Sequence, residues 1–469
     1  MQYRYRVMVV YIVGLFMTII DGTIVNVALP TLAREFDVSS TDIEWIAIAY
    51  LLALAAMIPA AGWLGDRFGT KRMFLTALTV FVVASGLCGA APNLEALITF
   101  RVLQGLGAGL ITPIGSAMLF RAFPLAERST ATVGVLSVAV VAPAIGPVLG
   151  GVLVDNISWR WIFFVNLPIG ALALTLAVIW LREEIQAAAG RLDVRGLVLS
   201  ATGVSLLIYT LSTGPEQGWL STQTIATGAI GVAAIVGLIV IELGLDQPLL
   251  QLRLFANQLF RVVNISAAMV YAGFFGWIFV LPLYMQTLRG FSATQSGLVQ
   301  APQALAIFVV SNLLGKRVYR AVGPRRLMIA GSAATALFTG GFVFVDLDTP
   351  LWMIACGSAL RGAAVGMVFV SIQTAVYATI SNAETGRATA LFNTQRQIAY
   401  AAGVAIAASV IAAKVSSVGG DSAPAIDRLP AYQWGFLAMG LIMLPAAVTS
   451  WFVHDEDVAA TRGLAPAPV

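Results

Sequence analysis

The chain has 469 residues, of which 59% are hydrophobic and only 11% are charged. Charged residues make up about a quarter of an ordinary soluble domain, so this composition excludes a soluble globular protein and indicates a chain that crosses a membrane many times. The net charge of +4 does not indicate a nucleic-acid partner, because the basic residues lie in short segments between apolar runs, as the positive-inside rule predicts.

The first apolar run, residues 11–30, is long enough to cross a bilayer and contains one acid, Asp21. A carboxylate in hydrocarbon is costly unless it is protonated, paired or in contact with water, so an acid inside a membrane helix indicates a functional site. The alternative is that Asp21 only pairs with another helix to fix its packing. We favour the functional interpretation because no other acid in the chain lies as deep in an apolar run.

Runs of roughly 20 apolar residues are long enough to form membrane helices, and the chain contains fourteen of them. We expect these helices at residues 7–29, 45–64, 73–92, 96–118, 130–154, 161–181, 197–213, 222–243, 261–285, 295–314, 327–345, 351–376, 388–413 and 431–453. An even number of crossings places both termini on one side of the membrane. Most of the 27 Lys and Arg residues lie in loops on that side, so both termini are expected in the cytoplasm.

Two distant stretches match at a constant offset of 257 positions, in which Gln104-Gly105, Gly109 and Gly146 correspond to Arg361-Gly362, Gly366 and Gly403. The offset pairs the fourth predicted helix with the twelfth and the fifth with the thirteenth, in the same orientation. This predicts two parallel repeats related by an axis along the membrane normal.

The expected fold is therefore an all-α polytopic membrane protein with a 6+2+6 arrangement of helices. An N-terminal six-helix bundle would span residues 1–181, cytoplasmic linkers with an inserted helix pair 182–259, and a C-terminal six-helix bundle 260–453. The remaining residues, 454–469, form a short polar tail with prolines, for which we predict disorder in the cytoplasm.

Arg101, in the fourth predicted helix, lies at a depth similar to that of Asp21, so the two charges can meet. Arg101, Gln104 and Thr112 share one helical face, and Thr18 shares a face with Asp21, a pattern suited to a water-filled cavity. Burial favours the protonated form of a carboxylate, whereas a nearby cation favours the ionised form. A carboxylate whose neighbours change with conformation can therefore couple transport to protons. The alternative for Arg101 is a purely structural charge partner.

Two further segments carry candidate residues for conformational change. Residues 62–74 form a turn whose charges either hold the cytoplasmic helix ends together in one state or remain solvated; this latch would comprise Gly65, Asp66, Arg67, Gly69, Lys71 and Arg72. In the fifth helix, prolines weaken the hydrogen-bond ladder and glycines permit close approach of another helix. A flexible contact and simple packing are both compatible with this second segment, which contains Gly146, Pro147, Gly150 and Gly151.

Several segments resemble the signature sequences of the major facilitator superfamily, and more narrowly of its fourteen-helix drug:proton antiporter family: DGTIVNVALP, GWLGDRFGTKR, RVLQGLGAGLITP, AIGPVLGG and SWRWIFFVNLPIG. The resemblance covers nearly the whole chain and implies two six-helix bundles that rock about a central cavity. It further implies that Asp21 and Arg101 belong to the proton-coupling machinery, that Asp66 and its neighbours form an inter-bundle latch, and that the segment at Gly146 is the antiporter motif typical of exporters.

The resemblance also implies a bacterial plasma (inner) membrane protein for multidrug efflux, driven by the proton gradient and without a cofactor. Its partners would be small-molecule substrates, protons and membrane lipids, with no obligate protein partner. Relatives that carry lipophilic cations often have further acids near helices 10 and 13, and this chain has none there. That departure favours neutral, zwitterionic or anionic substrates.

Polar and aromatic residues of the second half complete the candidate cavity, which comprises Thr18, Gln104, Thr112, Tyr271, Trp277, Arg361, Asn393 and Arg396. Arg361 and Arg396 lie near mid-membrane. They either face the cavity and attract an acidic substrate group, or bond to carbonyls and amide side chains. The two aromatic residues either line the cavity or pack against lipid and neighbouring helices.

The leading function is therefore a proton-coupled antiporter that exports small lipophilic compounds. The alternative on the same scaffold is an exporter or flippase of a lipid or dedicated metabolite. An enzyme would need a reactive cluster, yet the only histidine is His454 in the tail, and no metal-ligand spacing or ATP-binding GxxxxGK[ST] loop occurs. A membrane scaffold or receptor would need a soluble domain that the sequence does not contain.

Overall fold

The computed structural model describes residues 1–38, 40–185, 193–245, 248–291, 293–313, 317–381 and 383–462. Its helices in the first half of the chain are α1 (Tyr3–Phe36), α2 (Ser40–Met57), α3 (Ala61–Phe68), α4 (Thr70–Gly89), α5 (Leu94–Ala122), α6 (Arg128–Asn156), α7 (Trp161–Phe164) and α8 (Asn166–Trp180). The later helices are α9 (Val194–Gln217), α10 (Thr222–Gly244), α11 (Gln258–Leu283), α12 (Ala293–Leu313), α13 (Arg317–Val322), α14 (Pro324–Gly340), α15 (Leu351–Ala375), α16 (Thr385–Ser417) and α17 (Ala425–Ser450).

A helix occurs within each of the fourteen predicted runs. Within the described residues, eleven helices are long and apolar enough to cross a membrane, and the bent pair of α2 and α3 raises the number to twelve. The bend of 55° follows Met57, where Pro59 supplies no backbone N–H for a continuous helix. The protein is thus an all-helical membrane protein, and the full count of fourteen crossings stays a prediction.

The predicted repeat is visible in how the two halves pack. A methyl group at Gly105 of α5 would meet the Tyr50 carbonyl of α2, and one at Gly362 of α15 would meet the Gln303 carbonyl of α12. A second pair of corresponding glycines behaves likewise, because Gly146 of α6 packs on α1 and Gly403 of α16 packs on α11. Equivalent glycines therefore permit equivalent close helix contacts in both halves.

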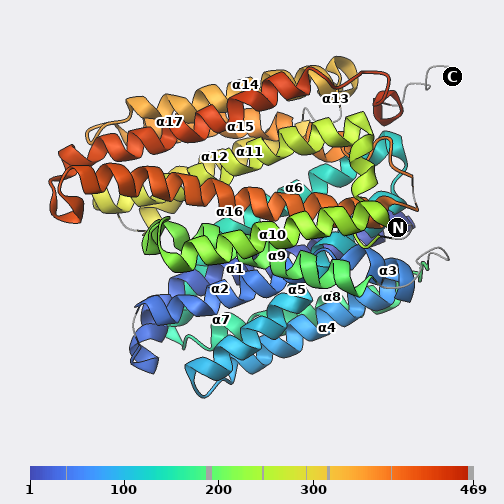
Figure 1. Cartoon of the computed structure of the whole chain (residues 1–469), viewed down its shortest axis with the longest axis horizontal. Coiled ribbons are helices and arrows are strands. Elements are labelled where there is room, and N and C mark those ends of the chain that lie inside the picture. Colours follow the sequence, from blue (N-terminus) through green and yellow to red (C-terminus); the bar gives the residue numbers. More distant parts are fainter. Residues whose placement is uncertain are drawn as a thin grey trace.

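The helices form two bundles with a pair of helices across their junction. Figure 1 shows α1 to α5, α7 and α8 on one side and α11 to α17 on the other, with α9 and α10 between them; α6 appears beside α12 and α16. On one side α9 contacts α2, where the Ser205 hydroxyl donates to the Leu52 carbonyl at 3.1 Å. The loop after α9 contacts α16, where the Trp219 indole donates to Ser409 Oγ at 2.8 Å. The inserted pair therefore touches both bundles.

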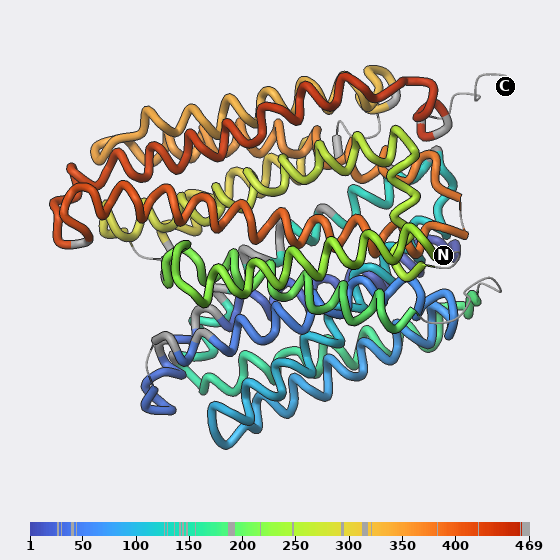
Figure 2. Tube along the Cα trace, viewed as in Figure 1, coloured from blue at the N-terminus to red at the C-terminus, as the bar shows by residue number. Residues whose placement is uncertain are grey.

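The N-terminus and the last described residues, which end at Arg462, lie at the same end of the molecule, called here the end of the termini (Figure 2). Polar contacts between the bundles gather toward this end. Arg128 Nη1 of α6 donates to the Tyr377 carbonyl at 2.7 Å, and the Thr389 hydroxyl of α16 is 3.3 Å from the Pro113 carbonyl of α5. These contacts hold the bundles together at the end of the termini.

The prediction of a disordered tail was wrong for residues 454–462. This segment ends in a short 3-10 helix, η6 (Ala459–Arg462), that packs against the C-terminal bundle. Val458 and Thr461 are fully buried, and the Thr461 hydroxyl lies 2.8 Å from the hydroxyl of Tyr319. Burial of these side chains outweighs the polar composition; residues 463–469 lie outside the described part.

Candidate functional site

Asp21 and Arg101 meet, as their predicted depths indicated. Arg101 Nη1 is 2.6 Å from Asp21 Oδ2, which joins α1 to α5 in the interior of the N-terminal bundle. Their side chains are 0% and 1% exposed. Removing one member of a fully buried ion pair costs about 3–5 kcal/mol, because the other charge is left without compensation. The two side chains therefore depend on each other in this conformation.

Two neutral amides complete the shell around the Asp21 carboxylate. Gln104 Nε2 and Asn166 Nδ2 each donate to Oδ1 at 2.8 Å. Asn166 comes from the start of α8 and also contacts Ser85 Oγ at 3.0 Å. Three helices, α1, α5 and α8, thus converge on one carboxylate, and Ser85 of α4 supports Asn166. The sequence analysis missed Asn166, whose only signal was an amide inside an apolar run, two residues before Pro168.

The other contacts of Arg101 are also within the N-terminal bundle. Its Nε donates to the Ile46 carbonyl at 3.2 Å, its guanidinium lies 4.0 Å from the Tyr50 ring centroid, and its Nη1 donates to Gln104 at 2.7 Å. The expectation that Arg101 and Gln104 line a water-filled cavity is therefore not met in this conformation. They belong to a closed cluster, because the α5 glycines bring α2 close enough to cover them.

Two other predicted cavity residues also lie elsewhere. The Thr18 hydroxyl donates to the Leu15 carbonyl of its own helix at 2.9 Å. Thr112 is half-buried, and its carbonyl accepts from Ser116 Oγ at 2.8 Å. Neither residue lines the cavity described below.

Two glycines of the predicted antiporter motif, Gly146 and Gly150, rest on the turn of α1 that follows Asp21. A methyl group at Gly146 would meet the Thr23 side chain, and one at Gly150 would lie 2.9 Å from Ile24 Cγ1. Gly151 faces open space within 4 Å, and the Pro147 side chain lies outside the described part. The close contact of α6 therefore lies beside the buried carboxylate.

Asp66 forms the part of the predicted latch that reaches the other bundle. Its Oδ1 accepts from Arg121 Nη2 at 2.8 Å, and both side chains are nearly buried. Gly386, at the start of α16, covers this pair, because a methyl group there would lie 3.1 Å from both Asp66 Oδ1 and Arg121 Nη2. An ion pair of the N-terminal bundle thus seats a helix end of the C-terminal bundle.

The rest of the predicted latch stays within the N-terminal bundle. Glu183 accepts from the backbone N–H groups of Lys71 and Arg72 at 3.1 and 3.2 Å, which places a carboxylate at the N-terminus of α4. Gly69, with φ of 96°, lies directly against the same carboxylate. Gly65 has only ordinary contacts, and Arg67 is exposed. The contacts of Glu183 with Lys71 and Arg72 therefore fix α4 to the segment after α8.

Arg361 is held by neutral groups in the C-terminal bundle. Its guanidinium donates to Thr339 Oγ1 at 2.9 Å and to Gln303 Oε1 at 2.5 Å, and it lies 4.0 Å from the Trp277 ring centroid. Arg361 and Trp277 are both fully buried. Of the two predicted alternatives for Arg361, its contacts match the one in which it bonds to neighbouring polar groups, and neither residue lines the cavity.

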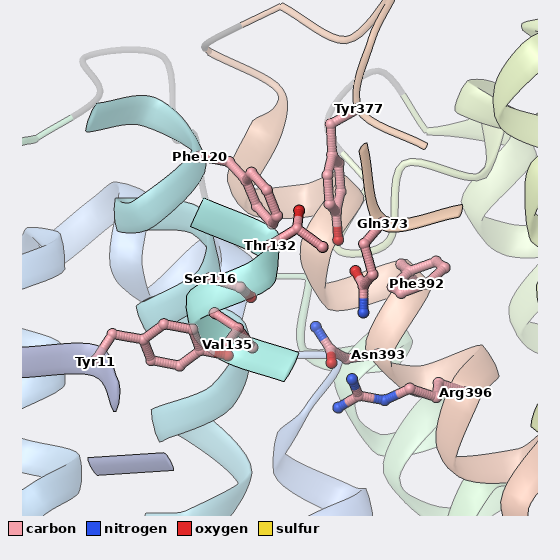
Figure 3. A pocket seen from close by; sticks show the side chains of 10 residues that line it. All are labelled: Tyr11, Ser116, Phe120, Thr132, Val135, Gln373, Tyr377, Phe392, Asn393 and Arg396. Atoms are coloured by element: carbon pink, nitrogen blue, oxygen red, sulfur yellow. The ribbon is translucent and has the colours of Figure 1, made fainter. Parts of the chain in front are cut away.

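A small cavity lies between the two bundles, and Figure 3 shows its lining residues: Tyr11, Ser116, Phe120, Thr132, Val135, Gln373, Tyr377, Phe392, Asn393 and Arg396. Its volume is about 30 Å³, which is room for about two water molecules. Of the predicted cavity residues, Asn393 and Arg396 line it. Tyr271 does not line the cavity, but its hydroxyl accepts from Nε2 of the lining residue Gln373 at 3.1 Å. In this conformation the bundles are closed at the end of the termini, where Arg128 and Thr389 connect them.

Comparison with known proteins matches the chain to the Major Facilitator Superfamily over residues 11–404 and 265–467. The chain is 33% identical over 408 residues to the Multidrug resistance protein Stp of Mycobacterium tuberculosis, which covers 86% of this chain and 75% of Stp. It is also 33% identical over 398 residues to the Multidrug export protein EmrB of Escherichia coli, with 83% of this chain and 77% of EmrB covered.

The solved structure of the human organic anion transporter MFSD10 (TETRAN) resembles the fold with a TM-score of 0.68 at 15% identity, over 94% of this chain and 100% of that one. Because the family match and both relatives extend over most of the sequence, the chain belongs to the major facilitator superfamily and is a membrane transport protein, not an enzyme.

Proposed function

We propose that the protein is a proton-coupled antiporter of the fourteen-helix type that exports small lipophilic compounds by alternating access. The observation that carries the proposal is the buried Asp21–Arg101 pair, with the glycines of α6 packed on the next turn of α1. The relatives named for multidrug resistance and multidrug export support drugs as substrates. The expected location is the bacterial plasma membrane, with both termini in the cytoplasm.

The geometry supports separate sites for the proton and the substrate. Asp21 belongs to the interior of the N-terminal bundle and does not line the inter-bundle cavity. Proton and substrate would therefore alternate through a change of conformation and would not compete for one group. Protonation of Asp21 removes the charge that Arg101 compensates, which weakens the tie between α1 and α5.

The α6 contact gives this change a route to the rest of the bundle. Gly146 and Gly150 touch Thr23 and Ile24, which follow Asp21 within one helical turn. A rearrangement around Asp21 therefore displaces the surface on which α6 rests. Because α6 also packs against α12 and α15 of the other bundle, the displacement acts directly on the junction between the bundles.

The test compares wild-type protein with Asp21→Asn in proteoliposomes that carry an imposed pH gradient. Asparagine retains the shape of the side chain but cannot bind and release a proton at neutral pH. We expect this variant to equilibrate substrate down its own gradient while losing the uphill transport that the pH gradient drives. The matched control is Asp346→Asn, which removes a carboxylate from an exposed loop.

Two results would contradict the proposal. Uphill transport by Asp21→Asn at the wild-type rate would show that another group carries the proton. A wild-type protein that moves no compound in response to the pH gradient would exclude proton-driven export. In both measurements, a single symmetric peak in size-exclusion chromatography is needed to show that the variant is folded.

A further inference from the structure

We infer that the cavity between the bundles binds amphipathic organic anions, and that Arg396 is the residue that selects them. This inference rests on the proposed export function and specifies the substrate class of the same transporter. The chemical class is a carboxylate or sulfonate attached to an aromatic or other apolar body. The inference depends on the charge balance of the membrane interior and on the composition of the cavity wall.

Arg396 differs from the other two arginines of the helix interiors in its partners. Arg101 is neutralised by Asp21, and Arg361 is bonded to Thr339 and Gln303 in a closed setting. Among the described residues, no carboxylate lies within ion-pair distance of Arg396. Its guanidinium lies 6.0 Å from the Tyr271 ring centroid and lines the cavity (Figure 3).

The remaining cavity wall adds no charge of either sign. Hydroxyl and amide groups come from Thr132, Gln373 and Asn393, and aromatic rings from Phe120 and Phe392. The cavity therefore has a positive potential, with polar groups and apolar surface close together. A guanidinium binds carboxylates and sulfonates through charge-assisted hydrogen bonds in a planar geometry. A permanent cation would be repelled by the guanidinium, and no carboxylate on this wall would offset that repulsion.

The small volume of the cavity explains how Arg396 is accommodated when no substrate is bound. The cavity holds about 30 Å³, so water molecules can solvate the guanidinium while larger molecules are excluded. When the bundles separate, the same surface opens with Arg396 on the C-terminal bundle and Phe120 and Thr132 on the N-terminal bundle. An anion bound there would contact both bundles at once.

Anionic substrates also make the exchange sensitive to the membrane potential. A proton that enters and a monovalent anion that leaves move charge in the same direction, so a potential that is negative inside favours both movements. Each charge moved per cycle changes the accumulation ratio on the order of 50-fold per 100 mV. The exchange of a neutral substrate for a proton moves one charge less.

The experiment uses two probes of nearly the same shape, 8-anilinonaphthalene-1-sulfonate and N-phenyl-1-naphthylamine, which differ by the sulfonate. Their transport is measured in proteoliposomes with an imposed pH gradient for wild-type protein, Arg396→Gln, Arg396→Lys and Arg361→Gln. We expect the sulfonate-to-neutral transport ratio to fall at least tenfold in Arg396→Gln and to recover in part in Arg396→Lys. The ratio should stay at the wild-type value in Arg361→Gln, because Arg361 is outside the cavity.

A second measurement needs only the wild-type protein and therefore does not depend on the folding of any variant. Valinomycin and potassium gradients set the potential, and the sulfonate should respond to it by one more charge per cycle than the neutral probe. An equal response would overturn the inference, as would an unchanged transport ratio in Arg396→Gln or a wild-type protein that moves only the neutral probe. If the wild-type protein moves neither probe with the pH gradient, it is the proposed function that fails.

Discussion

Gly62 of α3 packs directly against the other bundle at the end of the termini. A single methyl group at this position should therefore act as a wedge that pushes the two bundles apart. In Gly62→Ala the new methyl would lie 2.9 Å from the Gly386 carbonyl oxygen and 3.1 Å from Arg387 Cα. Both are backbone atoms of α16 and cannot rotate away. Overpacking of this kind costs about 1–3 kcal/mol, and here the cost falls on the closed state alone.

The expected consequence is a shift of population toward states in which the bundles are apart at this end. A cost of about 1–3 kcal/mol corresponds to a change of roughly 5- to 150-fold in the ratio of open to closed molecules. Gly65→Ala is the matched control, because a methyl group there has only ordinary contacts, the nearest at 3.6 Å. Both substitutions gain similar helix propensity, so they differ only in the wedge.

Electron–electron double resonance between spin labels at Thr76→Cys and Ala383→Cys would measure the shift. Both positions are exposed and lie on opposite bundles, and Cys88 and Cys356 are replaced in the background. A longer distance should gain population in Gly62→Ala and not in Gly65→Ala. Identical distance distributions in the two variants would refute the reasoning that this contact closes the bundles.

Three further outcomes follow from contacts within the bundles. Arg101→Met should lower the stability of the detergent-purified protein by about 3–5 kcal/mol, because Asp21 is left buried without its cation. The double variant Asp21→Asn/Arg101→Met should recover part of that loss in thermal unfolding. Strict additivity of the two single effects would show that the pair is not coupled. Gly146→Ala should lower uphill transport and stability because its methyl meets Thr23, whereas Gly151→Ala in the same motif should match wild type; equal effects of the two would argue against the α1–α6 contact. Truncation after His454 should lower the melting temperature by several degrees, because the buried Val458 and Thr461 are lost. Truncation after Arg462 is the control, because it removes none of these contacts. An unchanged melting temperature in the first truncation would contradict the docking of the tail.

Much of the helical arrangement follows from hydropathy and from the repeat. Apolar runs of membrane length locate the helices, and the offset between Gly105 and Gly362 anticipates the equivalent packing of α5 on α2 and α15 on α12. The meeting of Asp21 and Arg101 also follows, because the rise of a helix converts residue number into depth.

Hydropathy and the repeat could not predict contacts that depend on how a helix is rotated and on which distant helix it faces. Asn166 reaches Asp21 across 145 positions, and Arg121 reaches Asp66 across 55; hydropathy fixes the depth of such residues but not the helix they face. For the same reason, the sequence could not predict that Arg361 and Arg396 have different surroundings. Both lie near mid-membrane in the sequence, yet Arg361 turns into its own bundle and Arg396 toward the junction.

The placement of α9 bears on how lipid-soluble molecules can reach the interior. Val204 and Ile208 of α9 are buried against Ala55 of α2 and Ile398 of α16, so apolar side chains seal the flank where those two helices adjoin. On the opposite flank, where α6 meets α12 and α15, the described helices include no comparable cover. A compound diffusing sideways in the bilayer therefore faces a blocked flank and an uncovered one, which makes any lateral access one-sided.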